Sequence, residues 1–128
     1  MFIYLSFQFL GKVTVEKMVN EFGCDPNDII AAIGPCICED CYEVDMPVLD
    51  AFMESGIDVT GVFCEGRDEN HFMLNLVRAN KNILISAGIK EDNIDISDIC
   101  TCCNSSELHS HRATLGKRGN LAAIIELI

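Results

Sequence analysis

The apolar run at residues 29–33, "IIAAI", constrains the fold of this chain more than any other segment. It contains no polar side chain, and Gly34 and Pro35 end it. An unbroken apolar run of this length is typical of a short strand that is buried on both faces. A strand buried in this way needs helices to cover its sheet, so the run predicts an α/β or α+β fold.

Residues 12–22, 46–55 and 75–87 have the spacing and the ends of amphipathic helices. Asp45 and Asn75 are residue types that cap helix N-termini, and Pro is tolerated in a first turn. The glycines that stop the three helices are Gly23, Gly56 and Gly88. The side chains expected on the buried faces of the first and third helices are Val15, Met18, Val19, Phe22, Leu76, Asn80, Ile83, Leu84 and Ala87.

The remaining segments predict less regular structure. Residues 94–103 and 108–128 are expected to be extended around a glycine-bounded turn, and residues 121–127 are strongly apolar. Residues 1–9 show neither clean alternation nor helix caps, so they fit an edge strand or sequence foreign to the domain. We therefore expect an atypical segment, residues 1–9, followed by one domain, residues 10–128.

The charge of the chain excludes some partners. With 20 acidic and 9 basic residues, the formal net charge is -11, which disfavours both nucleic acid and anionic membranes. The apolar opening lacks a basic flank and a cleavage site, and it is too short to span a bilayer as a helix. We expect a cytoplasmic domain with reduced thiols, no nucleic-acid partner and no membrane partner.

Two cysteine clusters, at residues 36–41 and 100–103, contain most of the 8 cysteines. Four thiolates from two such clusters can hold a tetrahedral zinc ion. Buried free thiols are the alternative, whereas disulfides fit a secreted protein better. Cys41 stands just ahead of a predicted helix, where a thiol can become reactive. We assign no metal to the chain, and the alternative zinc ligands are Cys38, Cys41, Cys100 and Cys102.

The loop after the apolar run also carries a recognisable motif. "AAIGPCICEDCYEVDMPV" resembles the Ile-Gly-Pro-x-Ile-x-x-x-x-Tyr-Glu-Val signature of the laccase-domain proteins, also called multicopper polyphenol oxidases or YfiH-type purine nucleoside phosphorylases. Further matches follow in the family's order, among them "LNLVRANKNILISAGI", "ICTCCN" and "LHSHRATLGKRGNLAAIIEL". The resemblance covers about residues 10–128 and implies a mixed β-sheet sandwich flanked by helices, incomplete in this chain.

The resemblance implies metal-assisted phosphorolysis of adenosine, inosine, guanosine or methylthioadenosine, and also adenosine deamination. Purine nucleoside and phosphate would be the partners, and zinc or copper the cofactor. The family's metal ligands lie in Gln-x-His-Gly, Ala-Asp-Cys and His-Ala-Gly-Trp-Arg-Gly stretches, none of which occurs here, and the chain has 0 Trp. We therefore expect the C-terminal part of such an enzyme, without the metal ligands and inactive by itself.

The resemblance also indicates which residues would bind substrate. A tyrosine ring can stack on a purine, a neighbouring carboxylate can orient a ribose hydroxyl, and an arginine can hold phosphate. A core tyrosine, a carboxylate at a helix start and a surface arginine are the plainer explanations. The residues assigned to substrate binding are Gly34, Pro35, Tyr42, Glu43, His111 and Arg112.

Two hypotheses follow from the sequence. The first is part of an enzyme, completed only by ligands from elsewhere. The second is a cysteine-rich module without catalysis that folds around zinc or self-associates. Self-association would use the surface that the missing half would otherwise cover.

Overall fold

The computed structural model of the chain describes residues 3–124 and 126. The chain forms three helices, five short strands and three 3-10 turns in the described residues, and this confirms the mixed α/β class. The helices are α1 (Ile3–Phe22), α2 (Met46–Glu54) and α3 (Leu76–Ser86). The strands are β1 (Ala31–Ile33), β2 (Glu43–Asp45), β3 (Phe63–Glu65), β4 (His71–Leu74) and β5 (Ile94–Ile96). The 3-10 turns are η1 (Pro26–Asp28), η2 (Glu39–Cys41) and η3 (Glu91–Asn93).

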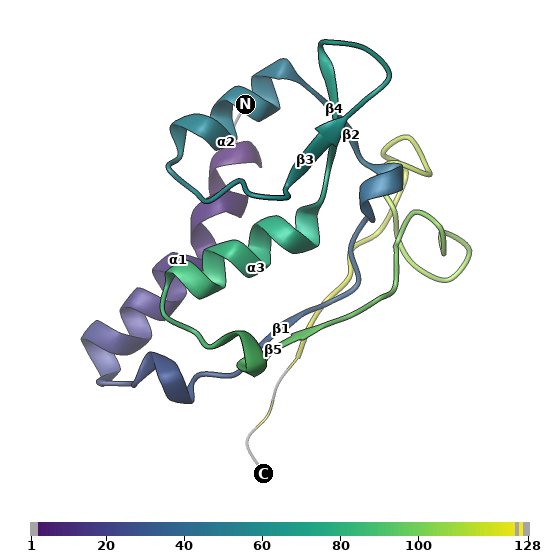
Figure 1. Ribbon diagram of the computed structural model, residues 1–128. Helices are drawn as coiled ribbons and strands as arrows, with labels where there is room; N and C mark the ends of the chain where they lie inside the picture. Colours follow the sequence, from purple (N-terminus) through teal and green to yellow (C-terminus); the bar gives the residue numbers. More distant parts are fainter. Residues whose placement is uncertain (1–2, 125, 127–128) are drawn as a thin grey trace.

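The strands form two separate sheets. Strands β1 and β5 pair in parallel, and β2, β4 and β3 form an antiparallel sheet in that order. Figure 1 shows α3 crossing the middle of the molecule, with the antiparallel sheet on one side and the β1–β5 pair on the other. Helix α1 packs against α3 and also contacts α2. The helices therefore connect two sheets that share no strand.

The hydrophobic core lies between α2, α3 and the antiparallel sheet. Its buried residues are joined by the half-buried rings of Tyr42, Phe63 and Phe72. The Phe52 ring meets the Phe63 ring edge-on, with 5.3 Å between the ring centroids, a favourable aromatic geometry. The buried members of this core are Val44, Val48, Phe52, Val62, Leu74 and Ala79.

Apart from the start of α1, the ends of the helices agree with the sequence-based prediction. The Asn75 side chain accepts a hydrogen bond from the Arg78 backbone N–H at 2.8 Å, as an N-cap residue does. Asp45 stands at the N-cap of α2, but its side chain makes no capping hydrogen bond. The glycines after all three helices have positive φ angles, from 67° at Gly23 to 101° at Gly88. They supply the left-handed residue with which many helices end.

The N-terminal segment differs from the prediction. Backbone from Ile3 continues α1 without a break, so residues 3–9 are not an edge strand. Gly11 lies inside this helix, where an added Cβ would come within 3.4 Å of the Leu84 side chain on α3. A small residue therefore lets the two helices approach closely. Phe22, expected on the buried face, is 77% exposed.

Two predicted strands also differ. Strand β1 is not buried on both faces, because its sheet has only two strands and α3 is the helix that packs on it. Ala32 is exposed in the middle of β1, and Ile30 just before it is 79% exposed. Residues 121–124 form no strand because no neighbouring strand pairs with them in the described part of the chain, and Ile124 is 94% exposed. Residues 125, 127 and 128 of the predicted extended end lie outside the described residues.

A search of the described residues finds no helix long and apolar enough to cross a membrane.

Phe52 and Met53 are neighbours on α2 and offer a matched test of the core. Phe52 is 7% exposed and Met53 is 60% exposed. Because Phe52→Ala leaves a cavity against Phe63, we expect it to lower the free energy of unfolding by about 3–5 kcal/mol. Met53→Ala should change it by less than about 0.5 kcal/mol. Urea unfolding followed by circular dichroism measures both, and similar losses in the two variants would contradict this core.

Candidate functional site

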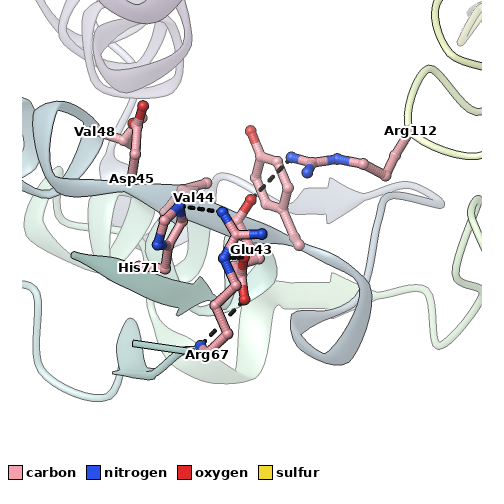
Figure 2. Close-up of a pocket in the computed structure, with 8 residues that line it drawn as sticks. Glu43, Val44, Asp45, Val48, Arg67, His71 and Arg112 are labelled. Atoms are coloured by element: carbon pink, nitrogen blue, oxygen red, sulfur yellow. Dashed lines mark hydrogen bonds and ion pairs between the residues drawn. The ribbon is translucent and has the colours of Figure 1, made fainter. Parts of the chain in front are cut away.

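An open pocket of about 330 Å³ lies beside β2. Figure 2 shows side chains from β2, from the β3–β4 turn and from a distant loop pointing toward one another around it. Most of these side chains are polar or charged, so the pocket suits a polar ligand better than an apolar one. The residues that line it are Tyr42, Glu43, Val44, Asp45, Val48, Arg67, His71 and Arg112.

The Glu43 carboxylate holds Arg67 at two points. Its Oε2 lies 3.2 Å from Arg67 Nε, and its Oε1 accepts the Arg67 backbone N–H at 3.2 Å. The β3–β4 hairpin sets this approach, because Gly66 bonds the His71 carbonyl through its own N–H at 3.0 Å. A Cβ on Gly66 would lie 2.4 Å from that carbonyl oxygen. A larger residue at position 66 would therefore displace the turn that carries Arg67.

His71 is held in one tautomer by its neighbours. Arg67 Nη2 lies 2.5 Å from His71 Nε2, and since arginine can only donate, Nε2 must accept. The ring proton is then on Nδ1, which donates to Asp68 Oδ1 at 2.6 Å. This bond, together with the Asn70 backbone N–H, lowers the pKa of Asp68 below its usual 3.8. Glu43, Arg67, His71 and Asp68 thus form one continuous hydrogen-bonded chain.

Arg112 reaches the pocket from the C-terminal part of the chain. Its Nη2 donates to the Glu43 backbone carbonyl at 3.0 Å, and its guanidinium carbon lies 5.3 Å from the centre of the Tyr42 ring. That separation is within the range of a cation–π contact. The pocket therefore combines two guanidinium groups, two carboxylates, an imidazole and an aromatic ring. Such a set can bind an anion beside a planar or hydroxyl-bearing group.

The structure brings some of the predicted substrate residues together. Tyr42, Glu43 and Arg112 line the pocket. Gly34 and Pro35 are exposed in the loop after β1, and His111 is absent from the pocket lining. The His111 ring instead faces Gly116, where an added Cβ would lie 3.4 Å from it. These assignments to substrate binding stay predictions.

Sequence reasoning missed three polar residues of the pocket, namely Asp45, Arg67 and His71. A signal for two of them exists in "FCEGRDENHFML", where apolar runs flank a Gly-, Asp- and Asn-rich stretch typical of a hairpin. The β3–β4 hairpin leaves Arg67 at its turn, and the pairing of β4 with β2 places His71 opposite Asp45.

A second group of side chains lies away from this pocket. The Sγ atoms of Cys38, Cys41, Cys100 and Cys103 are all within 4.8 Å of one another. Cys103 thus takes the place expected for Cys102, because residues 100 and 103 lie on the same side of their turn. Cys36 pairs with Cys100 as an isolated parallel bridge and stands outside the group.

The thiols of this group have altered acidities. Burial raises the pKa of Cys100, but backbone N–H donation from Cys103 and Cys38 outweighs burial and lowers it to about 6. Hydrogen bonding with Cys103 and then Cys38 raises the pKa of Cys41. The position of Cys41 ahead of a helix therefore does not make it the reactive thiolate that the sequence suggested.

The described residues do not fit a multicopper centre. Imidazole is the usual protein ligand for copper, with thiolates selecting copper(I) or zinc. His71 is engaged by Asp68 and Arg67, and the His109 Nδ1 accepts the Gly119 N–H at 3.4 Å. Over residues 3–124 and 126, the four-cysteine group is the one cluster with metal-ligand spacing, and it contains no histidine.

The fold and the pocket define a mixed α/β domain with a polar pocket that contains two arginines, and comparison with known proteins assigns its family. The family described as multi-copper polyphenol oxidoreductase laccase matches residues 7–128. The chain belongs to this family, as its motifs predicted.

The relatives in this family carry names from purine metabolism. Purine nucleoside phosphorylase YlmD of Bacillus subtilis is 31% identical over 116 residues, which are 91% of this chain and 41% of the relative. Adenosine deaminase RL5, from an unknown prokaryotic organism, is 31% identical over 103 residues, or 80% of this chain and 39% of the relative. The chain thus spans about two-fifths of the length of these relatives.

Solved structures give the same fold. The hypothetical protein YfiH of Bacillus licheniformis matches with a TM-score of 0.81 and 33% identity, over 86% of this chain and 41% of that one. YlmD of Geobacillus stearothermophilus matches with a TM-score of 0.79 and 30% identity, again over 86% and 41%. The YfiH-like fold is therefore confirmed, and this chain corresponds to part of it.

The bond between His71 and Asp68 can be tested by titration. Since the folded pKa of Asp68 lies below the ordinary 3.8, its contribution to stability is present above that pH. It is lost as the pH falls through the lower folded value. We expect His71→Ala to raise the pKa of Asp68 toward its ordinary value, measured by carboxyl-carbon NMR. His109→Ala is the matched control, and an Asp68 pKa that stays low in His71→Ala would contradict the contact.

Proposed function

We propose that this chain forms the nucleoside- and phosphate-binding part of a purine nucleoside phosphorylase-type enzyme. The observation that carries the proposal is the meeting of Tyr42 and Arg112 in one pocket, although 70 positions separate them. Each belongs to a motif through which the chain resembles the laccase-domain family, Tyr-Glu-Val and Ser-x-Arg. The names of the relatives support purine nucleosides as the substrate class.

Phosphorolysis explains the polar character of the pocket. A phosphate oxygen attacks the ribose C1′, the bond from C1′ to the purine nitrogen breaks, and the purine leaves with the bonding electrons and takes up a proton. The protein must hold phosphate against the sugar, which suits guanidinium donors. In this proposal Arg112 and Arg67 hold the phosphate, Tyr42 stacks on the purine and Glu43 orients both the ribose and Arg67.

Deamination of adenosine requires the same nucleoside but no phosphate. One relative is named an adenosine deaminase and another a purine nucleoside phosphorylase. Both names imply a purine nucleoside as the substrate of the relative. The two reactions separate in one assay, because phosphorolysis releases the free base and depends on phosphate, whereas deamination converts adenosine to inosine without it.

These 128 residues alone are proposed to lack catalysis. The resemblance assigns the family's metal ligands to His- and Cys-bearing motifs that do not occur in the sequence, and the described residues hold no imidazole-containing metal group. Catalysis then requires the part of the relatives that this chain does not cover. Self-association of this chain through its exposed apolar residues also remains a prediction.

A chimera tests the proposed function. This chain would be joined to the part of Bacillus subtilis YlmD that it does not cover. We expect phosphate-dependent release of hypoxanthine from inosine by the chimera and none by this chain alone. Arg112→Ala should lower the rate by about 10²-fold or more, since it removes a charged donor.

Arg118→Ala is the matched control, because Arg118 is exposed and its side chain bonds Gly119 and Asn120 rather than the pocket. Equal activity in the Arg112 and Arg118 variants would contradict the assignment of Arg112. Release of base by this chain alone would contradict the need for the missing part. NMR shifts of residues 42–45 on phosphate addition test binding separately from turnover.

A further inference from the structure

The group of four cysteine sulfurs is a second candidate site of the molecule, separate from the pocket. The distances between its sulfur atoms suit a single tetrahedrally coordinated ion. Cys41 Sγ lies 3.5 Å from Cys103 Sγ, and Cys38 Sγ lies 4.0 Å from the same atom. A zinc ion bound at about 2.3 Å to four sulfurs holds them roughly 3.8 Å apart from one another. These two separations lie on either side of this value, and all four sulfurs lie within 4.8 Å of one another, so one ion can reach all four after small side-chain adjustments.

The ligand spacing is that of two metal-binding knuckles. Cys38 and Cys41 are separated by two residues, and so are Cys100 and Cys103. Each pair stands in a tight turn, η2 in the first case and residues 101–104 in the second. Two short Cys-x-x-Cys turns from distant parts of a chain are the usual source of a closed four-cysteine zinc site.

Backbone donors point at one sulfur of the group. The N–H of Cys38 donates to Cys100 Sγ at 3.2 Å, and the N–H of Cys103 donates to the same sulfur at 3.4 Å. Hydrogen bonds to a sulfur favour its negatively charged form. Such donors are the outer contacts that orient thiolates around a metal and offset their charge.

Core packing does not explain the group. Cys103 is exposed, and Cys38 and Cys41 are only half-buried, so these side chains gain little by acting as small hydrophobic residues. Four cysteine sulfurs that converge this closely are typical of the ligands of one cation, and the net charge of -11 favours cations generally.

We propose that Cys38, Cys41, Cys100 and Cys103 form a structural zinc site. Four sulfur ligands in tetrahedral arrangement select zinc over the hard cations, and a site closed by four protein ligands leaves no position for substrate. Each thiol releases its proton to solvent as its sulfur binds the ion. This site is separate from the metal centre implied by the family and does not depend on the proposed function.

The site connects two segments that are 62 positions apart in sequence. Cys41 directly precedes Tyr42, so the ion fixes the start of the segment that carries Tyr42 and Glu43. Closing so long a loop costs conformational entropy, which zinc binding offsets. The ion therefore stabilises both the end of the β1–β5 pair and the position of one wall of the pocket.

Metal analysis of the chain purified without a histidine tag tests the site. We expect elemental analysis by inductively coupled plasma mass spectrometry to find about one zinc ion per chain. We expect the ion to stay bound during dialysis. Replacement with cobalt should give the intense visible absorption of a tetrahedral sulfur site. Removal of zinc by a strong chelator should lower the melting temperature, and added zinc should restore it.

Cys103→Ser and Cys102→Ser form the matched pair of variants. They change neighbouring residues of one turn, but Sγ of only the first belongs to the group. Cys103→Ser should lose at least about tenfold in zinc affinity against a chromophoric chelator, and Cys102→Ser should keep both zinc and the cobalt spectrum.

Three results would overturn the proposal. A folded wild-type chain without zinc that takes up none on addition excludes the site, whatever the variants do. If the purified chain contains no metal and a thiol reagent detects two fewer free thiols than the sequence has cysteines, the contact between Cys41 and Cys103 is a disulfide. Iron in place of zinc in the purified chain excludes zinc as the resident ion.

Discussion

The parallel pairing of β1 with β5 is the contact on which the rest of the structure depends. Its register pairs Ala31 with Ile94 through Ile33 with Ile96, and a parallel bridge between Cys36 and Cys100 follows beyond the strands, shifted by one residue. Because the strands are parallel, the chain leaves both in the same direction, and Figure 1 shows the two following loops on one side of the molecule. The cysteine group and the contact of Arg112 with Tyr42 are formed by the segments that follow β1 and β5 along the chain.

Local features of the fold were predictable because their causes are local. Asn75 caps α3 through its own side chain, and Gly88 adopts the left-handed conformation that ends the helix. The exposure of β1 was not predictable in this way. Ile30 and Ala32 sit in an unbroken apolar run, but whether both faces are covered depends on how many strands and helices pack beside them. The number of strands and helices beside β1 is set by contacts between residues that are distant in the sequence.

The residues of the pocket also divide into those that the sequence could predict and those that it could not. Tyr42, Glu43 and Arg112 were assigned through the family resemblance, which carries the effect of long-range contacts that composition and periodicity do not contain. Arg67 and His71 join them only because the β2–β4 register puts His71 opposite Asp45 and the hairpin turn puts Arg67 beside Glu43. Among the cysteines, the spacing of Cys100 and Cys103 was available in the sequence, but their convergence on Cys38 and Cys41 required the strand pairing.

In the proposed function, phosphate binding by so acidic a chain would depend on how its few cationic side chains are held. Arg67 is paired with two carboxylates, at 3.2 Å to Glu43 and 3.7 Å to Asp68, which weaken its attraction for a further anion. Arg112 is held instead by a backbone carbonyl and by the face of the Tyr42 ring. Neither contact carries a net charge, so both orient the guanidinium while leaving its positive charge intact. In the proposed function Arg112 would therefore supply most of the attraction for phosphate, and Arg67 would add a weaker contact while it holds Glu43 and His71 in place.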